Sequence, residues 1–148
     1  MPWTLDPHSG GVKIPNAVQN RTRQRILAYA EKEYKGRYVS LDIRFRGSLC
    51  YIDAYVEPDV AESWPPRDWP ETRNQMIERL RKTPVHLVRL RYFGPDNRWS
   101  LAFFTYSNER YTPCVFHSGD FFGTAEESLD VGATYLPAAP ANPKGIGK

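Results

Sequence analysis

Cysteine is scarce in this chain, and a long apolar run is missing. Cys50 and Cys114 are the two cysteines among 148 residues, too few for the disulfide framework of a small secreted protein. We expect buried thiols in a cytoplasmic protein, with a Cys50–Cys114 disulfide as the alternative. The N-terminal residues lack the apolar segment of a secretory signal. No run approaches the roughly 18 apolar residues of a membrane span, so no membrane partner is expected.

Familiar chemical motifs are missing too. The chain has no P-loop, no Gly-x-Gly-x-x-Gly turn, no Gly-x-Ser-x-Gly elbow and no RNP-like motif. Its three histidines, His8, His86 and His117, lie far apart in the sequence. They have no cysteine or glutamate at ligand spacing, which argues against a structural zinc site. We therefore expect no cofactor, apart from a divalent cation under one hypothesis below.

A large excess of one charge is also lacking. The net charge of +3, taken alone, hints at a nucleic-acid partner. Residues 1–15 and 137–148 carry Lys13, Lys144 and Lys148 against Asp6, a sum of +2, whereas residues 16–136 carry 17 basic and 16 acidic residues. Binding of an anion must therefore depend on the local placement of charge.

Aromatic residues and prolines are what the chain has in quantity. Aromatic residues make up 14% of it, which excludes intrinsic disorder and requires a packed core. Prolines gather near the N-terminus, over residues 58–70 and near the C-terminus. We expect a flexible arm over 1–15, a single domain over 16–136 and a flexible Pro/Ala/Gly/Lys tail over 137–148.

Regular elements follow from capping boxes and alternating patterns. Boxes at 16–19, 68–71 and 124–127 predict the starts of three helices. Alternation predicts strands over 38–46, 49–57, 85–93, 98–107 and 110–117. The order α-β-β-α-β-β-β-α predicts a single α+β domain with a five-stranded, mainly antiparallel sheet and helices packed on one face.

Four segments resemble a group of small bacterial proteins that has no assigned activity. These segments are Arg44–Tyr55, Leu90–Gly94, Ala102–Arg110 and Gly123–Glu127. The likeness spans residues 14–136. It implies a bacterial origin and carries no functional residue over to this chain.

Turn lengths predict which side chains share a face of the sheet. Counting from the turns gives the pairs Asp42–Asp53, Arg44–Tyr51, Arg91–Ser100, Ser100–His117, Leu101–Phe116 and Phe103–Cys114. Apolar residues then gather on a core side, where His86 is also expected. The opposite side, the open face, is expected to hold Asp42, Arg44, Tyr51, Asp53, Tyr55, Arg89, Arg91, Ser100, Phe104, Tyr106, Tyr111 and His117.

Asp42 and Asp53 are expected to oppose each other with Cβ atoms about 4.5–5.5 Å apart, where two carboxylates repel. A divalent cation, a shared proton or an arginine such as Arg44 could offset the repulsion. One hypothesis is therefore a hydrolase or nuclease in which this acid pair binds a metal or does acid–base work, assisted by His117 beside Ser100. The alternative is a solvated face neutralised by Arg44.

Arginine supplies 14 of the 20 basic residues, and its planar fork suits phosphate and carboxylate. On the open face arginines interleave with aromatic rings, as on sheets that hold single-stranded nucleic acid. The leading hypothesis is a binding module for an anionic partner: nucleic acid, a phosphorylated ligand or an acidic protein. Its expected contacts are Arg44, Arg89, Arg91, Tyr51, Tyr55 and Ser100. The alternative is a charged face that resists aggregation.

The loop over residues 62–70 carries two tryptophans. Trp64 and Trp69 would pin this loop to the body, with Trp69 stapling the start of the second helix. Alternatively the loop contacts a protein partner or a second copy of the chain, because surface tryptophans favour interfaces. An interaction subunit is thus the third hypothesis.

Overall fold

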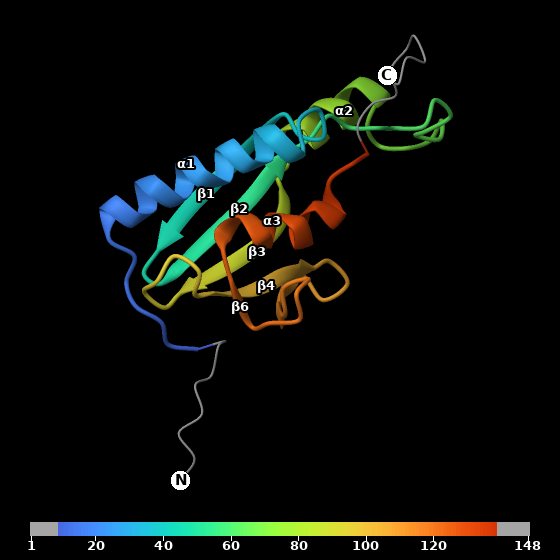
Figure 1. The fold of residues 1–148 in the computed structure, drawn as a ribbon. Helices are drawn as coiled ribbons and strands as arrows, with labels where there is room; N and C mark the ends of the chain where they lie inside the picture. The colour runs from blue at the N-terminus through green and yellow to red at the C-terminus, as the bar shows by residue number, and fades with distance from the viewer. Residues whose placement is uncertain (1–8, 139–148) are drawn as a thin grey trace.

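The structure is a computed structural model that describes residues 9–138 (Figure 1). In chain order its elements are α1 (Asn16–Glu33), β1 (Ser40–Arg46), β2 (Leu49–Tyr55), α2 (Arg73–Lys82), β3 (Val85–Tyr92), β4 (Trp99–Thr105), β5 (Arg110–Cys114), β6 (Phe122–Gly123), α3 (Ala125–Gly132) and the 3₁₀ turn η1 (Ala133–Tyr135). The predicted α+β class and the order of the main elements are confirmed.

The strands form an antiparallel meander. Their order in the sheet is β1-β2-β3-β4-β5, and the short β6 pairs with β4. Helices α1 and α3 lie side by side on one face of this sheet (Figure 1). Helix α2 lies beyond one end of the sheet, next to the long loop that precedes it. The sheet therefore has one face covered by helices.

The core lies between the sheet and the two covering helices. Alternate strand residues such as Ile52, Leu90 and Leu101 are buried there against Ile26 of α1. Helix α3 approaches β3 closely at Gly132. A Cβ added to this glycine would lie 3.0 Å from the Cβ of Leu87, so a larger residue would not fit without a shift. The apolar residues predicted for the core side thus face the helices, and their alternation leaves the charged residues on the other side.

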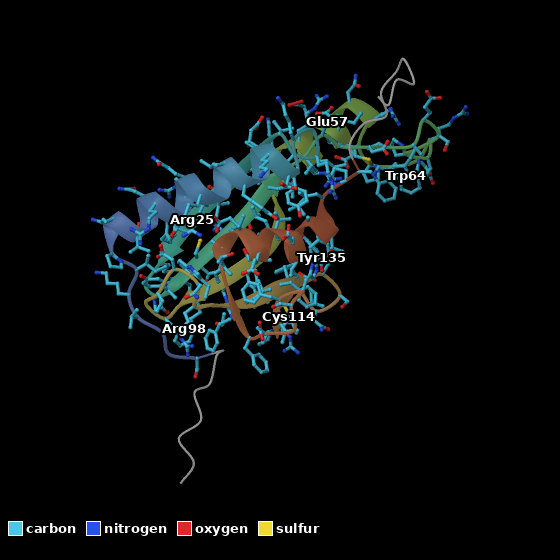
Figure 2. All side chains as sticks on the ribbon, viewed as in Figure 1. Arg25, Glu57, Trp64, Arg98, Cys114 and Tyr135 are labelled. Atoms are coloured by element: carbon cyan, nitrogen blue, oxygen red, sulfur yellow. The ribbon has the colours of Figure 1, made fainter. Side chains whose placement is uncertain are left out.

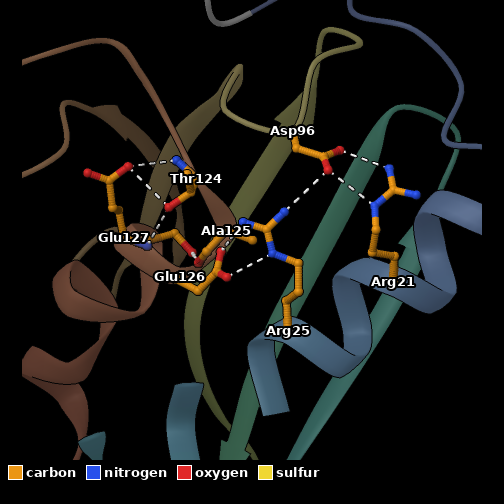
Figure 3. A network of polar contacts seen from close by, with 8 residues as sticks. Arg21, Arg25, Asp96, Thr124, Ala125, Glu126 and Glu127 are labelled. Carbon is orange, nitrogen blue, oxygen red and sulfur yellow. Dashed lines mark hydrogen bonds and ion pairs between the residues drawn. The ribbon is translucent and has the colours of Figure 1, made fainter. Parts of the chain in front are cut away.

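One ion-pair network ties the helices to a turn of the sheet (Figure 3). Arg25 of α1 donates to both carboxylate oxygens of Glu126 in α3, at 2.8 and 2.9 Å. Arg21 and Arg25 also reach Asp96 in the β3–β4 turn, and Arg21 holds the pKa of Asp96 below its usual range. The network fixes α1 and α3 relative to the sheet.

Two of the three predicted helix starts needed correction. Asn16 is expected to cap helix α1, but it is the first residue of the helix; Pro15 is the N-cap, and no side chain caps the helix. Helix α2 begins at Arg73 rather than near Asp68, and its capping box is formed by Thr72 and Gln75. The predicted box of Thr124 with Glu127 is confirmed at the start of α3.

The late start of α2 has a physical cause in the loop before it. The guanidinium of Arg73 donates to the carbonyls of Val60, Ala61 and Trp64. These bonds hold the preceding residues in an irregular loop, and Pro70 has no N–H to extend a helix. Trp69 therefore lies in the loop and not at the helix start.

The turn between β4 and β5 corrects the predicted register of β5. The turn spans residues 106–109, with Glu109 in the left-handed region at φ 53°, where a two-residue turn was expected. Leu101 consequently pairs with Cys114, not with Phe116. The shift is two residues, so each side chain keeps its predicted face.

The segment before α1 lies against the sheet. Val12 donates its N–H to Tyr92 and Ile14 donates to Gly47, at 2.9 and 3.0 Å. The side chain of Ile14 is buried at 1% exposure. Residues 9–15, expected in a flexible arm, are thus bound to the domain. The expectations for residues 1–8 and 139–148 lie outside the described residues.

Two further expectations concern membrane-spanning helices and the two cysteines. Within residues 9–138, none of the helices combines the length and the apolar character that crossing a membrane requires. Cys50 is buried and Cys114 is half-buried, and both are free. Burial raises the pKa of the Cys50 thiol to about 12, as expected of an unreactive core cysteine.

Candidate functional site

The open face is the side of the sheet opposite α1 and α3. Two of its charged side chains are accessible: Arg44 is 51% exposed and Asp42 is 43% exposed. The face carries four arginines, Arg44, Arg46, Arg89 and Arg91, against the two aspartates Asp42 and Asp53. It therefore has an excess of positive charge that the composition of the whole chain does not indicate.

Arg44 resolves the repulsion predicted between two opposed carboxylates. The register places Asp42 directly opposite Asp53, as expected. Nε of Arg44 lies 3.2 Å from Asp42, and its Nη2 lies 2.8 Å from Oδ2 of Asp53. The guanidinium thus bridges the pair, so Arg44 is committed to a local ion-pair network. Within residues 9–138 no three potential metal ligands cluster.

A β-bulge in β3 brings His86 to this face. Ile52 pairs with Val88 and Asp53 pairs with His86, which leaves Leu87 as the extra residue. Leu87 and Val88 are both buried toward the helices, so the alternation of the strand reverses at this point. The expectation that His86 lies on the core side is therefore wrong.

His86 and Asp53 form a hydrogen-bonded pair. Nδ1 of His86 lies 3.0 Å from Oδ1 of Asp53. The Asp53 side chain is 2% exposed, whereas the imidazole is 36% exposed. Each oxygen of this buried carboxylate thus has its own partner, Arg44 on one side and His86 on the other.

Aromatic rings surround the imidazole. Its centroid lies 4.7 Å from the ring of Phe104, 6.4 Å from Tyr111 and 6.5 Å from Tyr106, with which it is stacked. The hydroxyl of Tyr106 accepts the backbone N–H of His86 at 2.7 Å. The histidine is therefore held from its backbone, its ring faces and Nδ1.

A band of alternating guanidinium and tyrosine groups crosses the sheet beside the pair. Arg44 lies over Tyr51 and Arg89 lies over Tyr111, each 5.3 Å from the ring centroid. The two tyrosine rings meet edge to face at 5.6 Å. Burial, with the Asp53 carboxylate, raises the pKa of Tyr111 to about 12. We call these four residues the Arg–Tyr band.

The remaining predicted ligand residues lie apart from the band. Arg91 donates to the carbonyl of Gly10 at 3.1 Å. Ser100 is buried at 3% exposure and pairs with Arg91 and with Phe122 of β6. Tyr55 lies at the end of β2, opposite Ser40. Ser100 therefore offers little surface to a ligand.

His117 lies outside the site. The strand ends at Cys114, and the chain turns at His117, where Gly119 donates its N–H to Phe116 and Phe116 donates to Asp120. The place beside Ser100 expected for His117 is occupied by Phe122 of β6. The predicted contact of His117 with Ser100 is wrong, and the histidine of the site is His86.

The tryptophan loop projects beyond the sheet, beside α2 (Figure 2). Trp64 and Trp69 pack on each other with ring centroids 5.2 Å apart. Each remains 42% exposed. The contact with a partner or a second copy that such exposure favours stays a prediction.

His86 is the residue that sequence reasoning missed, although a signal was present. In Val85–Tyr92 the polar residues of the open face are His86, Arg89 and Arg91. The consecutive apolar residues Leu87 and Val88 interrupt the two-residue period, as a bulge requires. Comparisons with protein-family models, with curated proteins and with solved structures find no match to this chain. The site must be interpreted from its own geometry.

Proposed function

We propose that this protein is a binding module that holds an anionic partner on its open face, and that the preferred partner is single-stranded nucleic acid. The observation that carries the proposal is the Arg–Tyr band on a sheet face that α1 and α3 leave uncovered. Guanidinium groups pair with phosphates, while tyrosine rings stack on bases.

The distribution of charge indicates which arginines would contact phosphate. Arg44 is shared by Asp42 and Asp53, so its charge is already offset. Arg89 contributes its positive charge within the band. Arg89, which lies over Tyr111, combines the charge and the aromatic contact and is the central residue of the proposal.

Aromatic content separates nucleic acid from the other two partners. A phosphorylated small ligand or an acidic protein needs the arginines but has no general use for stacked tyrosines. Bases have π-faces whatever their sequence, and each stacking contact contributes about 1–3 kcal/mol. We place this function in the cytoplasm of a bacterium, as the two free thiols and the resemblance of the sequence suggest.

Fluorescence anisotropy with a labelled single strand of about 10 nucleotides tests the proposal. Arg89→Ala should weaken binding and should reduce the slope of log K against log salt by about 0.7, the value for one phosphate contact on a single strand. Arg67→Ala in the tryptophan loop removes the same charge elsewhere and should change neither quantity.

The partner class is decided in the same assay. A duplex of the same sequence should bind more weakly, because its bases are not free to stack. Equal competition by polyglutamate would identify an acidic protein as the partner class instead. An Arg89→Ala protein with unchanged affinity and salt slope would contradict the proposed site.

A further inference from the structure

The Asp53–His86 pair has a geometry that anion binding does not require. A buried carboxylate holds Nδ1 of a partly exposed imidazole at 3.0 Å. Among the described residues no group bonds Nε2 of His86. Catalytic histidines are oriented in this way, because a carboxylate on one nitrogen fixes the ring and leaves the other nitrogen to exchange a proton.

Two features of the fold orient this pair. The extra residue Leu87 reverses the alternation of β3 and brings His86 to the open face, and bulges often re-aim side chains next to active sites. Arg44 occupies the second oxygen of Asp53 at 2.8 Å, so the carboxylate cannot rotate away from the histidine without breaking an ion pair. The imidazole is therefore held in one orientation.

The neighbours of the ring indicate where a nucleophile must come from. Phe104 and Tyr111 present their rings to the imidazole, and the hydroxyl of Tyr106 is engaged by a backbone N–H. No described serine, threonine or cysteine bonds the imidazole. A base at this position would therefore act on a hydroxyl group of the bound partner.

The arginine of the proposed binding site lies within reach. His86 and Arg89 share the open face and are at most about 10 Å apart along the strand. A phosphate held by Arg89 would place the adjoining sugar near His86. In RNA that sugar carries a 2′-hydroxyl next to the phosphate, which supplies the nucleophile that the protein lacks.

We propose that His86 is a general base that cleaves RNA bound to the open face, an inference that rests on the proposed function. Nε2 takes the proton of the 2′-hydroxyl as the 2′-oxygen forms a bond to phosphorus and the bond from phosphorus to the 5′-oxygen breaks. The leaving 5′-oxygen takes a proton from water, and the imidazolium returns one to water. The products are a 2′,3′-cyclic phosphate and a 5′-hydroxyl.

Two other residues have supporting roles in this step. Arg89 would stabilise the negative charge that grows on the phosphoryl oxygens. Asp53 is a positioning residue, because it acts on the substrate only through His86. A strand without 2′-hydroxyls should bind the same face and stay intact.

An end-labelled oligoribonucleotide and its fully 2′-O-methylated equivalent are the probes. The full chain should cut the first into fragments with 2′,3′-cyclic phosphate ends and should bind the second with similar affinity without cutting it. His86→Gln should lower the cleavage rate by about 100-fold or more while the Kd for the methylated strand is unchanged. Added imidazole should restore part of the cleavage by His86→Gly.

Asp53→Asn tests the positioning role at a temperature where circular dichroism shows the variant folded. It should lower kcat with little change in KM, whereas Asp59→Asn, which removes the same charge from an exposed loop residue, should leave both unchanged. Tight binding of RNA without cleavage would overturn this inference and leave the proposed function standing. A protein that neither binds nor cleaves RNA would overturn this inference and the proposed function together. Cleavage that persists in His86→Gln would show that His86 is not the base.

Discussion

Asp53 is a charged residue of the open face whose side chain is almost completely buried. Its side chain is 2% exposed, yet both oxygens have partners, Arg44 at 2.8 Å and His86 at 3.0 Å. A buried carboxylate is tolerated when such partners replace water. The same partners make the site sensitive to any change at this residue.

Replacement of Asp53 by asparagine should destabilise the protein. Asparagine has nearly the same shape but loses the charge that strengthens both hydrogen bonds, so we expect a loss of about 1.5–3 kcal/mol in the free energy of unfolding. Urea denaturation measures the difference. Asp42→Asn, at the exposed end of the same network, should cost less than about 1 kcal/mol. A more stable Asp53→Asn protein would mean that repulsion between the two aspartates outweighs their contacts with Arg44.

At the residue scale, the sequence predicted that Asp42 opposes Asp53 but did not predict that His86 lies beside Asp53. The opposition of Asp42 and Asp53 follows from a two-residue turn, and the structure has it. The position of His86 depends on a bulge whose extra residue, Leu87, is stabilised by the packing of α3 against β3. A register count assumes an unbroken period of two and therefore could not place it.

The contact between α1 and α3 depends on tyrosine hydroxyls as well as on ion pairs. Tyr29 of α1 and Tyr34, the C-cap of that helix, both donate to the carboxylate of Asp130 in α3. Burial and these bonds raise the pKa of Tyr29 to about 12 from its ordinary 10.0, and they raise the pKa of Tyr34 as well. The interface thus requires both hydroxyls to keep their protons.

This requirement predicts alkaline unfolding. A tyrosine whose pKa is higher in the folded state contributes stability that is complete below the unfolded pKa, about 10. That contribution is lost as the pH rises through the folded value, so thermal stability should fall between about pH 10 and 12. Tyr29→Phe should be less stable than the parent chain at pH 8 and should lose less stability over this range. A parent chain with constant stability from pH 10 to 12 would contradict this account.

Element boundaries were predictable where local chemistry decides them. The box of Thr124 and Glu127 depends on four consecutive residues and was identified correctly. The start of α2 depends on Arg73, whose guanidinium binds carbonyls 9 to 13 residues earlier in the chain. A local pattern contains no information about such a contact, and the predicted start near Asp68 was therefore wrong.

On the scale of the whole molecule, one face of the sheet forms the core and the other carries the candidate site. α1 and α3 cover one face (Figure 1). The apolar core residues of the strands lie on that face, and the Arg–Tyr band lies on the other. The net charge of +3 describes neither face. The relevant quantity is the excess of arginine over aspartate on the open face, which follows from register and not from composition.

Charge at the end of the chain should therefore contribute little to binding. Lys144 and Lys148, which lie outside the described residues, account for two of the positive charges in the sequence. The double variant Lys144→Gln/Lys148→Gln should keep its affinity for a single strand within about twofold at roughly 200 mM salt, where non-specific attraction is weak. Electrophoretic mobility shift measures this. A loss as large as that of Arg89→Ala would assign the binding to the end of the chain.

The bulge in β3 also bears on how such a surface can arise. Before Leu87 the even-numbered residues of the strand face the solvent, and after Val88 the odd-numbered residues do. A gene that lacked the Leu87 codon would encode a regular strand in which Val88 still pairs with Ile52 and His86 still pairs with Asp53. The imidazole beside Asp53 thus does not depend on the extra codon, which instead adds a second buried side chain, Leu87, against α3.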